Sequence, residues 1–335
     1  MSRVRVATGG RIHFGFLNLS LAHDRLYGSL GVGVDEPRTV VTAERAAGVD
    51  CGSPTAREYA ERAVDLLEVP GAAVTVESSL PRHVGLGSGT RLALAVLAAV
   101  GGAYGRDPDV RELAPDLGRG GRSGVGVGTF RRGGFVLDGG HPTAQFTTRR
   151  PEDGNWTVPA VTARHEVPDD WRFLLVIPDV DAGRNGDAED ESMRAVVERA
   201  EPAVADRIAG VVTRRLLPAV ADGSAERFGA AVDAVGRLNG TWYADEQGGV
   251  YRPPVGDLIA ALDDEPACYG AGQSSWGPCV YAVTDAAHAE AARAAGRDAL
   301  SAAGVDGAVR VTGGRNRGAE ITTLQSEAAA GTTEE

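Results

Sequence analysis

The sequence predicts an α+β protein built as two halves, each with strands and helices of its own. The first third of the chain alternates strand-like runs with glycine-rich turns, and the segment Thr90 to Gly105 that follows is apolar almost all round. The second half mixes strand-like runs with long helical segments. An apolar run of this length is typical of a buried helix, and the mixture that follows is typical of an α+β sandwich.

Alternating apolar residues and β-branched side chains predict the strands of the first half. These strands are VRVA, RIHFGFL, LGVGV, RTVVTAE and AAVTVES. A helix is expected near Thr55 to Leu67, and the buried helix begins at Thr90. The order is therefore strands first, then mixed strands and helices.

The second half is expected to open with two strands and to continue with long helices. The strand runs are VTARHEV, RFLLVIP, VYAVT and GAVRVT, and the helical stretches are Met193 to Ala221, Ala225 to Tyr243 and Ala286 to Ala302. A polar stretch from Gly139 to Asn155 reads as an exposed connection. These patterns predict one domain over 1–160, a second over 161–325 and a disordered tail over 326–335.

All basic side chains of the chain are arginine, because its 34 Lys and Arg residues include no lysine. A P-loop needs its lysine on the phosphates, and Schiff-base enzymes need a lysine amine. Any anion site must therefore use arginine, backbone N–H groups or a metal. Drift of the whole composition toward arginine on an acidic surface explains the absence equally well.

The overall charge and the cysteines exclude further classes. A net charge of −12 argues against a nucleic-acid-binding surface. The N-terminus has no signal region and no apolar run reaches the roughly 18 residues of a membrane span, so we expect a cytoplasmic protein that binds no membrane. Cys51, Cys268 and Cys279 lack any ligand spacing and are expected to be reduced core residues.

A glycine-rich loop lies between a predicted strand and the buried helix. It consists of Gly85, Leu86, Gly87, Ser88, Gly89 and Thr90. Glycines at a helix start let backbone N–H groups approach an anion at the positive end of the helix, and the two hydroxyls add donors. A helix-capping turn without a ligand is the alternative.

The segment PRHVGLGSGTRLALAV around this loop resembles the second motif of the GHMP kinases. RIHFGFL near the N-terminus and GAGQSSWGPCVYAV near the C-terminus supply companion motifs in the expected order. This resemblance implies the two-domain GHMP fold, with an N-terminal half like ribosomal protein S5 domain 2 and a C-terminal ferredoxin-like α/β sandwich.

More narrowly, the chain resembles the β-ribofuranosylaminobenzene 5'-phosphate synthase family. The motifs are RIHFGFL, LGVGVDEP, HVGLGSGT, GRSGVGVGTFRRGGFVLDGG, GQSSWGP and GGRNRGAEI, in this order along the chain. The resemblance implies condensation of phosphoribosyl pyrophosphate with 4-hydroxybenzoate or 4-aminobenzoate, with loss of carbon dioxide and pyrophosphate, in methanopterin-type biosynthesis. Arg91 follows the loop where this family would have glutamine, and it places a charge beside the anion site.

Two other functions remain open. The first is an ATP-dependent small-molecule kinase of the same superfamily, but Val127 stands where many such kinases have an aspartate that assists the substrate hydroxyl. The second is a protein that binds a phosphorylated metabolite without turnover.

The inferred reaction assigns roles to three candidate acid–base groups. His13 projects away from its apolar neighbours and is expected to titrate near neutral pH beside the para substituent, or to be a structural histidine. Asp35 and Glu36 are candidates for metal or proton chemistry, or lie in a solvated turn.

The remaining candidates bind the substrates. Pyrophosphate is assigned to the loop, with Mg²⁺ as the expected cofactor and no metal ligands assigned. Arg315 and Arg317 are expected on the 5'-phosphate or the carboxylate, or in surface ion pairs. The aromatic substrate or the ribose is assigned to Gln273, Ser274, Ser275 and Trp276, and further contacts to Arg11 and His83.

The acidic segment Asp179 to Arg194 is a candidate lid or a hydrated face. A homodimer is expected.

Overall fold

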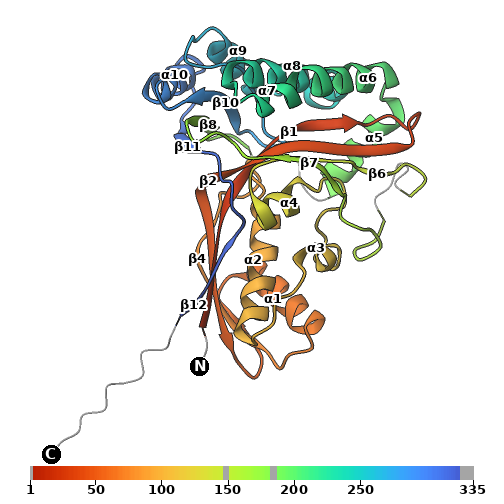
Figure 1. Ribbon diagram of the computed structural model, residues 1–335, viewed down its shortest axis with the longest axis vertical. Helices are drawn as coiled ribbons and strands as arrows, with labels where there is room; N and C mark the ends of the chain where they lie inside the picture. The colour runs from red at the N-terminus through yellow and green to blue at the C-terminus, as the bar shows by residue number, and fades with distance from the viewer. Residues whose placement is uncertain (1–2, 146–150, 182–186, 325–335) are drawn as a thin grey trace, which may run out of the picture.

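A long antiparallel hairpin forms the backbone of the molecule. In the computed structural model, which describes residues 3–145, 151–181 and 187–324, β1 (Arg3–Asn18) pairs with β2 (Arg25–Arg45). The prediction of shorter, separate strands here is wrong, because bulges at Gly9/Arg11 and His13/Gly15 shift the register without ending the pairing. The hairpin rises through the lower body and bends beneath the upper helices (Figure 1).

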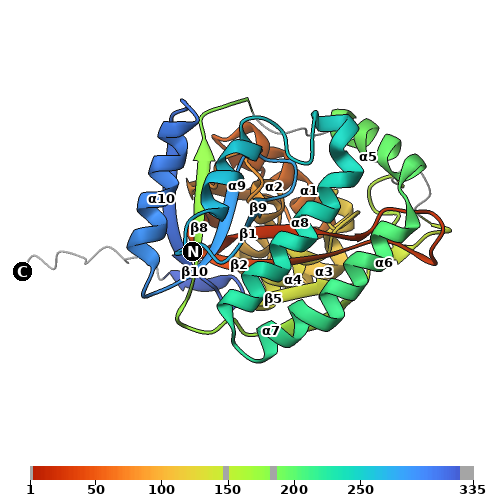
Figure 2. The same cartoon turned by 90° about the horizontal axis from the view of Figure 1, so that it is seen from above.

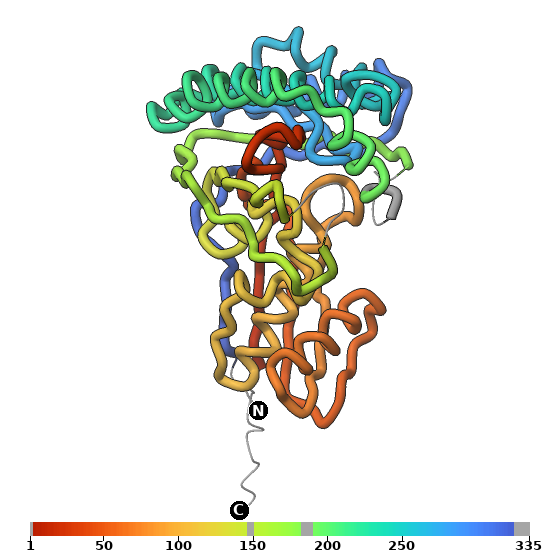
Figure 3. Tube along the Cα trace, turned by 90° about the vertical axis from the view of Figure 1, so that its right-hand side faces the viewer, coloured from red at the N-terminus to blue at the C-terminus, as the bar shows by residue number. Residues whose placement is uncertain are grey.

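The other strands of the first sheet add to both ends of this hairpin. At one end lie β12 (Glu320–Leu324), β4 (Ala72–Ser78) and β3 (Val49–Cys51), and at the other lie β5 (Phe135–Asp138), β6 (His141–Pro142) and β7 (Val161–His165). The chain therefore returns to the first sheet near its C-terminal end, and β12 runs beside β1 (Figure 3). The domain limits 1–160 and 161–325 stay a prediction, and the tail 326–335 lies outside the described residues.

Helices cover one side of this sheet. They are α1 (Pro54–Leu66), α2 (Ser88–Ala103), α3 (Val110–Leu113), the 3₁₀ turn Pro115–Leu117 and α4 (Val125–Arg132). The predicted buried helix is confirmed, because residues 93–101 of α2 are all buried. The expected exposed connection after Gly139 is wrong at His141, which is buried and pairs with β2.

The second sheet is antiparallel and carries the remaining helices. Its strand order is β11 (Gly307–Gly313), β8 (Trp171–Pro178), β10 (Val280–Asp285), β9 (Ala271–Gln273). The helices are α5 (Asp187–Arg199), α6 (Pro202–Val211), α7 (Leu217–Ala221), α8 (Ala225–Gln247), α9 (Val255–Asp263) and α10 (Ala289–Ala302). The helical stretch predicted over Met193 to Ala221 is confirmed, and a new helix, α6, begins within it at Pro202 because proline lacks the N–H that a helix interior needs.

The two halves share a hydrophobic core across the hairpin. Figure 2 shows α6 and α8 lying over β1 and β2. Phe14 of β1 meets Phe228 of α8 at 5.6 Å and Tyr281 of β10 at 5.0 Å between ring centroids, both edge to face. The bent end of the hairpin is thus held against the second half, and the site described below lies beside this bend.

Candidate active site

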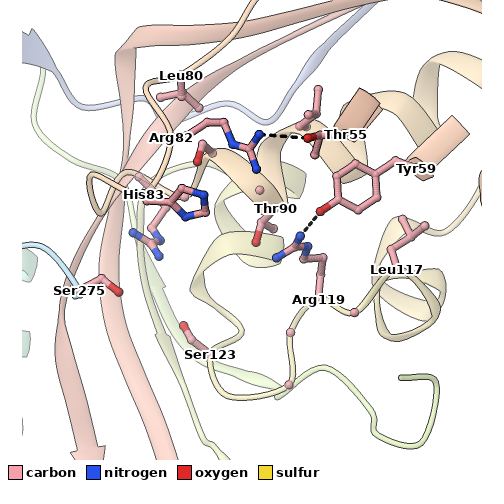
Figure 4. Close-up of a pocket in the computed structure, with 18 of the residues that line it drawn as sticks. Thr55, Tyr59, Leu80, Arg82, His83, Thr90, Leu117, Arg119, Ser123 and Ser275 are labelled. Carbon is pink, nitrogen blue, oxygen red and sulfur yellow. Dashed lines mark hydrogen bonds between the residues drawn. The ribbon is translucent and has the colours of Figure 1, made fainter. Parts of the chain in front are cut away.

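A cleft of about 640 Å³ opens beside the hairpin (Figure 4). Its walls come from β1, α1, the loop before α2, the segment before α4 and the turn between β9 and β10. Segments far apart in the sequence therefore meet here. The lining includes all the predicted loop contacts, namely Gly85, Gly87, Ser88, Gly89 and Thr90, together with Arg11, His13, His83, Ser275 and Trp276.

The glycine-rich loop has the backbone geometry of an anion-binding helix start. Gly85 and Gly87 have φ of 95° and 80°, in the region that favours glycine, and Gly87 is the N-cap of α2. A Cβ at Gly85 would stand 2.1 Å from the carbonyl oxygen of Ser274, so no side chain fits there. The first N–H groups of a helix have no partner within it, and here they begin at the cleft.

Three arginines surround this loop. The Nη1 of Arg11 donates to the carbonyl of Gly85 at 2.5 Å, and a Cβ at Gly87 would lie 3.1 Å from Arg11 Cγ. Arg82 Nη1 donates to Thr55 Oγ1 at 3.1 Å, and Arg119 donates to the hydroxyl of Tyr59 and lies over its ring (Figure 4). The residues that line the cleft include five arginines and three carboxylates, so the cleft is locally positive within an acidic chain.

Arg91 does not line the cleft, which corrects the expectation of a charge directly beside the anion. Its side chain is 1% exposed and donates to the carbonyls of Gly126 and Gly10 and to Thr129 Oγ1, at 2.8, 3.3 and 2.7 Å. Burial, followed by the charge of Arg11, lowers the pKa of Arg91 to about 9. The guanidinium therefore ties α2 to β1 and α4 beneath the loop.

A second part of the cleft, its aromatic end, lies at the turn between β9 and β10. Phe16 and Trp276 line it, and the ring of Trp276 meets that of Tyr243 at 4.6 Å. A smaller recess of about 50 Å³ adjoins this end, and Phe16 and Trp276 line it too. Gln273 lines the recess, where its Nε2 donates to the carbonyl of Ser275 at 3.2 Å and its Oε1 has no partner.

His13 lies between the loop and the aromatic end. It lines both cavities, and its ring contacts that of Phe16 at 4.9 Å. Burial, followed by the charge of Arg11, lowers the pKa of His13 to about 3, which corrects the expectation that it titrates near neutral pH. Ser274 is buried behind it and accepts from the His13 N–H at 3.1 Å while donating to the carbonyl of Gly85 at 2.7 Å.

Four charged residues that were predicted for the site do not line the cleft. Arg315 Nη1 donates to Asp35 at 3.2 Å and its Nη2 to Glu320 at 3.3 Å, with the arginine side chain 3% exposed. Arg317 pairs with Glu320 at 2.8 Å, and Glu36 pairs with Arg38 at 3.0 Å. These ion pairs join the end of β11 and the next turn to β2, and their residues lie outside both cavities.

The structure adds cleft residues that were not assigned from the sequence. Arg82 precedes the loop within its own motif, and Arg119, Arg122 and Ser123 come directly before α4. Each of these residues is close in sequence to a glycine-rich motif, and this could have marked them as candidates. Only folding brings the segment before α2 and the segment before α4 together. Asp190 pairs with Arg122 at the rim of the cleft, while residues 182–186 of the proposed lid lie outside the described residues.

The described residues contain no group of three or more His, Cys, Asp or Glu side chains that could hold a metal ion. Oxygen donors are present in the cleft, namely the hydroxyls of Ser88 and Thr90 and the carboxyl group of Glu58. Hard oxygen ligands of this kind suit Mg²⁺. The three cysteines are buried and unpaired, and the described helices include none long and apolar enough to cross a membrane.

Similarity to solved structures agrees with this architecture. A homoserine kinase from Cytophaga hutchinsonii matches with a TM-score of 0.66 and 17% identity over 96% of this chain and 97% of the other. A mevalonate diphosphate decarboxylase from Staphylococcus aureus matches with a TM-score of 0.65 and 14% identity over 96% and 98%. At these identities the likeness establishes the fold alone, which is the predicted GHMP fold.

Sequence relatives define the family more narrowly. Residues 55–130 match the GHMP kinases N terminal domain and residues 216–302 the GHMP kinases C terminal family. The beta-ribofuranosylphenol 5'-phosphate synthase of Archaeoglobus fulgidus is 35% identical over 95% of this chain and 99% of its own length. The protein of the same name from Methanothermobacter thermautotrophicus is 32% identical over 94% and 97%. The chain therefore belongs to the beta-ribofuranosylphenol 5'-phosphate synthase family of the GHMP superfamily.

Proposed function

We propose that the protein joins phosphoribosyl pyrophosphate to 4-hydroxybenzoate or 4-aminobenzoate, releasing carbon dioxide and pyrophosphate, as a step of methanopterin-type biosynthesis. The observation that carries this proposal is a single cleft that brings together a glycine-rich helix start and an aromatic wall, with a smaller aromatic recess adjoining it. The full-length match to proteins named beta-ribofuranosylphenol 5'-phosphate synthase supports it.

The loop end suits the phosphorylated substrate. The start of α2 offers backbone N–H groups and the hydroxyls of Ser88 and Thr90, and Arg11, Arg82 and Arg119 surround it. Phosphoribosyl pyrophosphate carries a 5'-phosphate and a pyrophosphate, and each of them needs positive groups around it. A guanidinium group can donate two parallel hydrogen bonds to the oxygens of one phosphate. The positive field also stabilises the negative charge that develops on pyrophosphate as its bond to the ribose breaks.

The aromatic end suits the benzoate. Phe16, Trp276 and neutral His13 form a wall against which an aromatic ring can stack. Holding that ring next to the loop aligns the attacking carbon with the anomeric carbon and replaces a bimolecular encounter with a positioned one. Gln273 Oε1, which has no partner in the recess, is an acceptor for a donor on the ligand.

Mg²⁺ is part of this proposal. The hydroxyls of Ser88 and Thr90 and the carboxyl group of Glu58 would hold it together with pyrophosphate oxygens. When bound, the ion would neutralise charge on the leaving group. We further propose a cytoplasmic homodimer whose partners are its small-molecule substrates, and gel filtration against known standards tests the dimer.

The deciding experiment incubates the purified chain with Mg²⁺, phosphoribosyl pyrophosphate and each benzoate in turn. Pyrophosphate and carbon dioxide are measured together, and ATP with an added alcohol serves as the control reaction. Stoichiometric release of both products supports the proposal and identifies the acceptor. Turnover of ATP alone would favour a kinase, and saturable binding of phosphoribosyl pyrophosphate without products would favour a binding protein.

A further inference from the structure

The proposed reaction needs a group that takes a proton from the para substituent of the acceptor, and the expected candidates do not supply it. Asp35 and Glu36 lie outside the cleft in ion pairs with arginines. His13 lines the cleft, but its pKa is lowered to about 3, so it is a weak base. The proton acceptor can instead be a carboxyl group that is connected to the cleft by hydrogen bonds through other side chains.

Such a carboxyl group lies behind the cleft at the start of α4. Asp138, on β5, is fully buried and accepts a hydrogen bond from Ser29 through its Oδ2. Ser29 Oγ lies 2.6 Å from Ser123 Oγ, and Ser123 lines the cleft (Figure 4). The backbone N–H groups of Gly124 and Gly140 donate to Asp138 at 2.8 and 2.9 Å. One unbroken chain of hydrogen bonds thus joins the cleft to a buried carboxyl group.

The strand register builds this chain. Ser29 of β2 pairs directly with Asp138 of β5 on one side and with Phe16 of β1 on the other. Phe16 and Ser123 both line the cleft, so the chain of hydrogen bonds reaches the cavity that the aromatic wall also lines. Val127, where the kinase aspartate would stand, is buried in the core of the first half and leaves that position without a carboxyl group.

The direction of the hydrogen bonds follows from counting protons. Each serine hydroxyl has one proton to donate. Ser29 donates to the ionised Asp138, so Ser123 must donate to Ser29 and presents only lone pairs to the cleft. When Asp138 is protonated the chain reverses, and Ser123 becomes a donor toward the cleft. The protonation state of a buried group thereby sets the hydrogen-bonding character of the cleft surface.

The surroundings of Asp138 favour exchange of a proton near neutral pH. Burial raises its pKa to about 6, against the opposing effect of the hydrogen bonds from Ser29, Gly140 and Gly124. The charged and titratable groups around it among the described residues are Arg25, which donates to the carbonyls of Gly139 and Gly140, and His141, whose pKa burial lowers to about 4. Arg122, next to Ser123, pairs with Asp190.

We propose that Ser123, Ser29 and Asp138 form a proton relay that takes the proton of the acceptor's para O–H or N–H group and returns it within the same turnover. The inference rests on the proposed function. Ser123 is the group that touches the substrate, and Asp138 is a positioning residue that acts through the two serines.

The proton balance closes over two steps. As the ring carbon that bears the carboxylate bonds to the anomeric carbon, pyrophosphate leaves with the electron pair of its bond. The para proton moves to Ser123, the Ser123 proton to Ser29 and the Ser29 proton to Asp138, which leaves a dienone or its imine that still bears the carboxylate. The bond to the carboxylate then breaks, carbon dioxide leaves, and the released electron pair restores the aromatic ring. The para atom takes its proton back through the same chain.

The test compares the pH profile of kcat/KM in wild type, Asp138→Asn and Ser123→Ala. We expect an acid limb near pH 6 in wild type, and a loss of about a hundredfold with disappearance of that limb in both variants. Their affinity for pyrophosphate should be unchanged. The matched control is Asp109→Asn, because Asp109 likewise accepts hydrogen bonds from two backbone N–H groups yet lies outside the cleft. A wild-type acid limb that persists in Ser123→Ala would overturn the relay.

A second measurement does not depend on turnover. The infrared band of the protonated carboxyl group that Asp138→Asn removes should titrate near pH 6, and Ser29→Ala should shift that midpoint. A midpoint near the ordinary aspartate value, or one that Ser29→Ala leaves in place, contradicts the relay. Failure of wild type to release carbon dioxide and pyrophosphate would instead contradict the proposed function, so the two failures are separate.

Discussion

Two segments of the chain combine glycines with nearby arginines, but the folded chain gives these arginines different surroundings. Gly85–Thr90 begins α2 at the cleft, and Arg82, which precedes it, donates to the neutral Thr55 Oγ1. Gly313–Gly318 follows β11, and its Arg315 is buried against Asp35 and Glu320. A guanidinium already paired with carboxylates has little charge to offer a ligand. The partners of each arginine therefore distinguish a binding site from a structural joint.

The largest expected effect comes from altering the loop itself. Gly87→Val combined with Ser88→Ala should weaken binding of phosphoribosyl pyrophosphate by about a hundredfold or more, because a Cβ at residue 87 enters the space of Arg11 and a β-branched residue resists positive φ. Calorimetric titration measures the affinity, and circular dichroism checks that the fold remains. Unchanged affinity in a folded variant would mean that the loop is not the anion site.

The second prediction concerns the other segment. Arg315→Ala should lower the free energy of unfolding by about 2 kcal/mol, since it leaves Asp35 and Glu320 without their buried partner, although both carboxylates are partly exposed. Urea unfolding at neutral pH measures the change. Pyrophosphate affinity should stay the same, and a weakened affinity with full stability would return Arg315 to the binding site.

The third prediction compares one exposed arginine from each segment. Arg82→Gln should raise the KM for phosphoribosyl pyrophosphate by about tenfold, because a charge-assisted contact is lost. Arg317→Gln is the matched control and should leave KM unchanged, since its side chain is 63% exposed and pairs with Glu320. Equal effects of the two substitutions would remove the distinction between the segments.

The smallest expected effect is a pH dependence of stability at the cleft. His13 has a folded pKa near 3, below its unfolded value of 6.5, so the unfolded chain binds the proton first and stability falls as pH drops below 6.5. Between pH 7 and 5.5 this amounts to about 1 kcal/mol. His13→Gln should make the decline shallower by that amount in urea unfolding. Asp138 acts in the opposite direction, because its raised pKa stabilises the fold at lower pH, so the variant must be compared with wild type at each pH.

The fold was predictable from the sequence to the extent that local patterns determine it. The strand Ala72–Ser78 and the buried helix that begins at the loop follow from alternation and from an apolar run. The continuous hairpin did not follow, because its bulges interrupt the alternation that marks a strand. The strand β12 at the far end of the chain owes its place to pairing with β1, a contact of long sequence separation.

For the site, the sequence alone predicted the glycine-rich loop that lines the cleft, since glycines with positive φ at a helix start are a local requirement. It also identified the aromatic turn with Trp276, which lines the same cleft. Only the tertiary structure decided which charged side chains face that cleft. Arg82, Arg119 and Arg122 do, whereas Asp35 and Arg315 neutralise each other elsewhere. The reason is physical: the charge that a side chain offers and the pKa that it adopts depend on burial and on partners from distant segments, and local sequence carries neither.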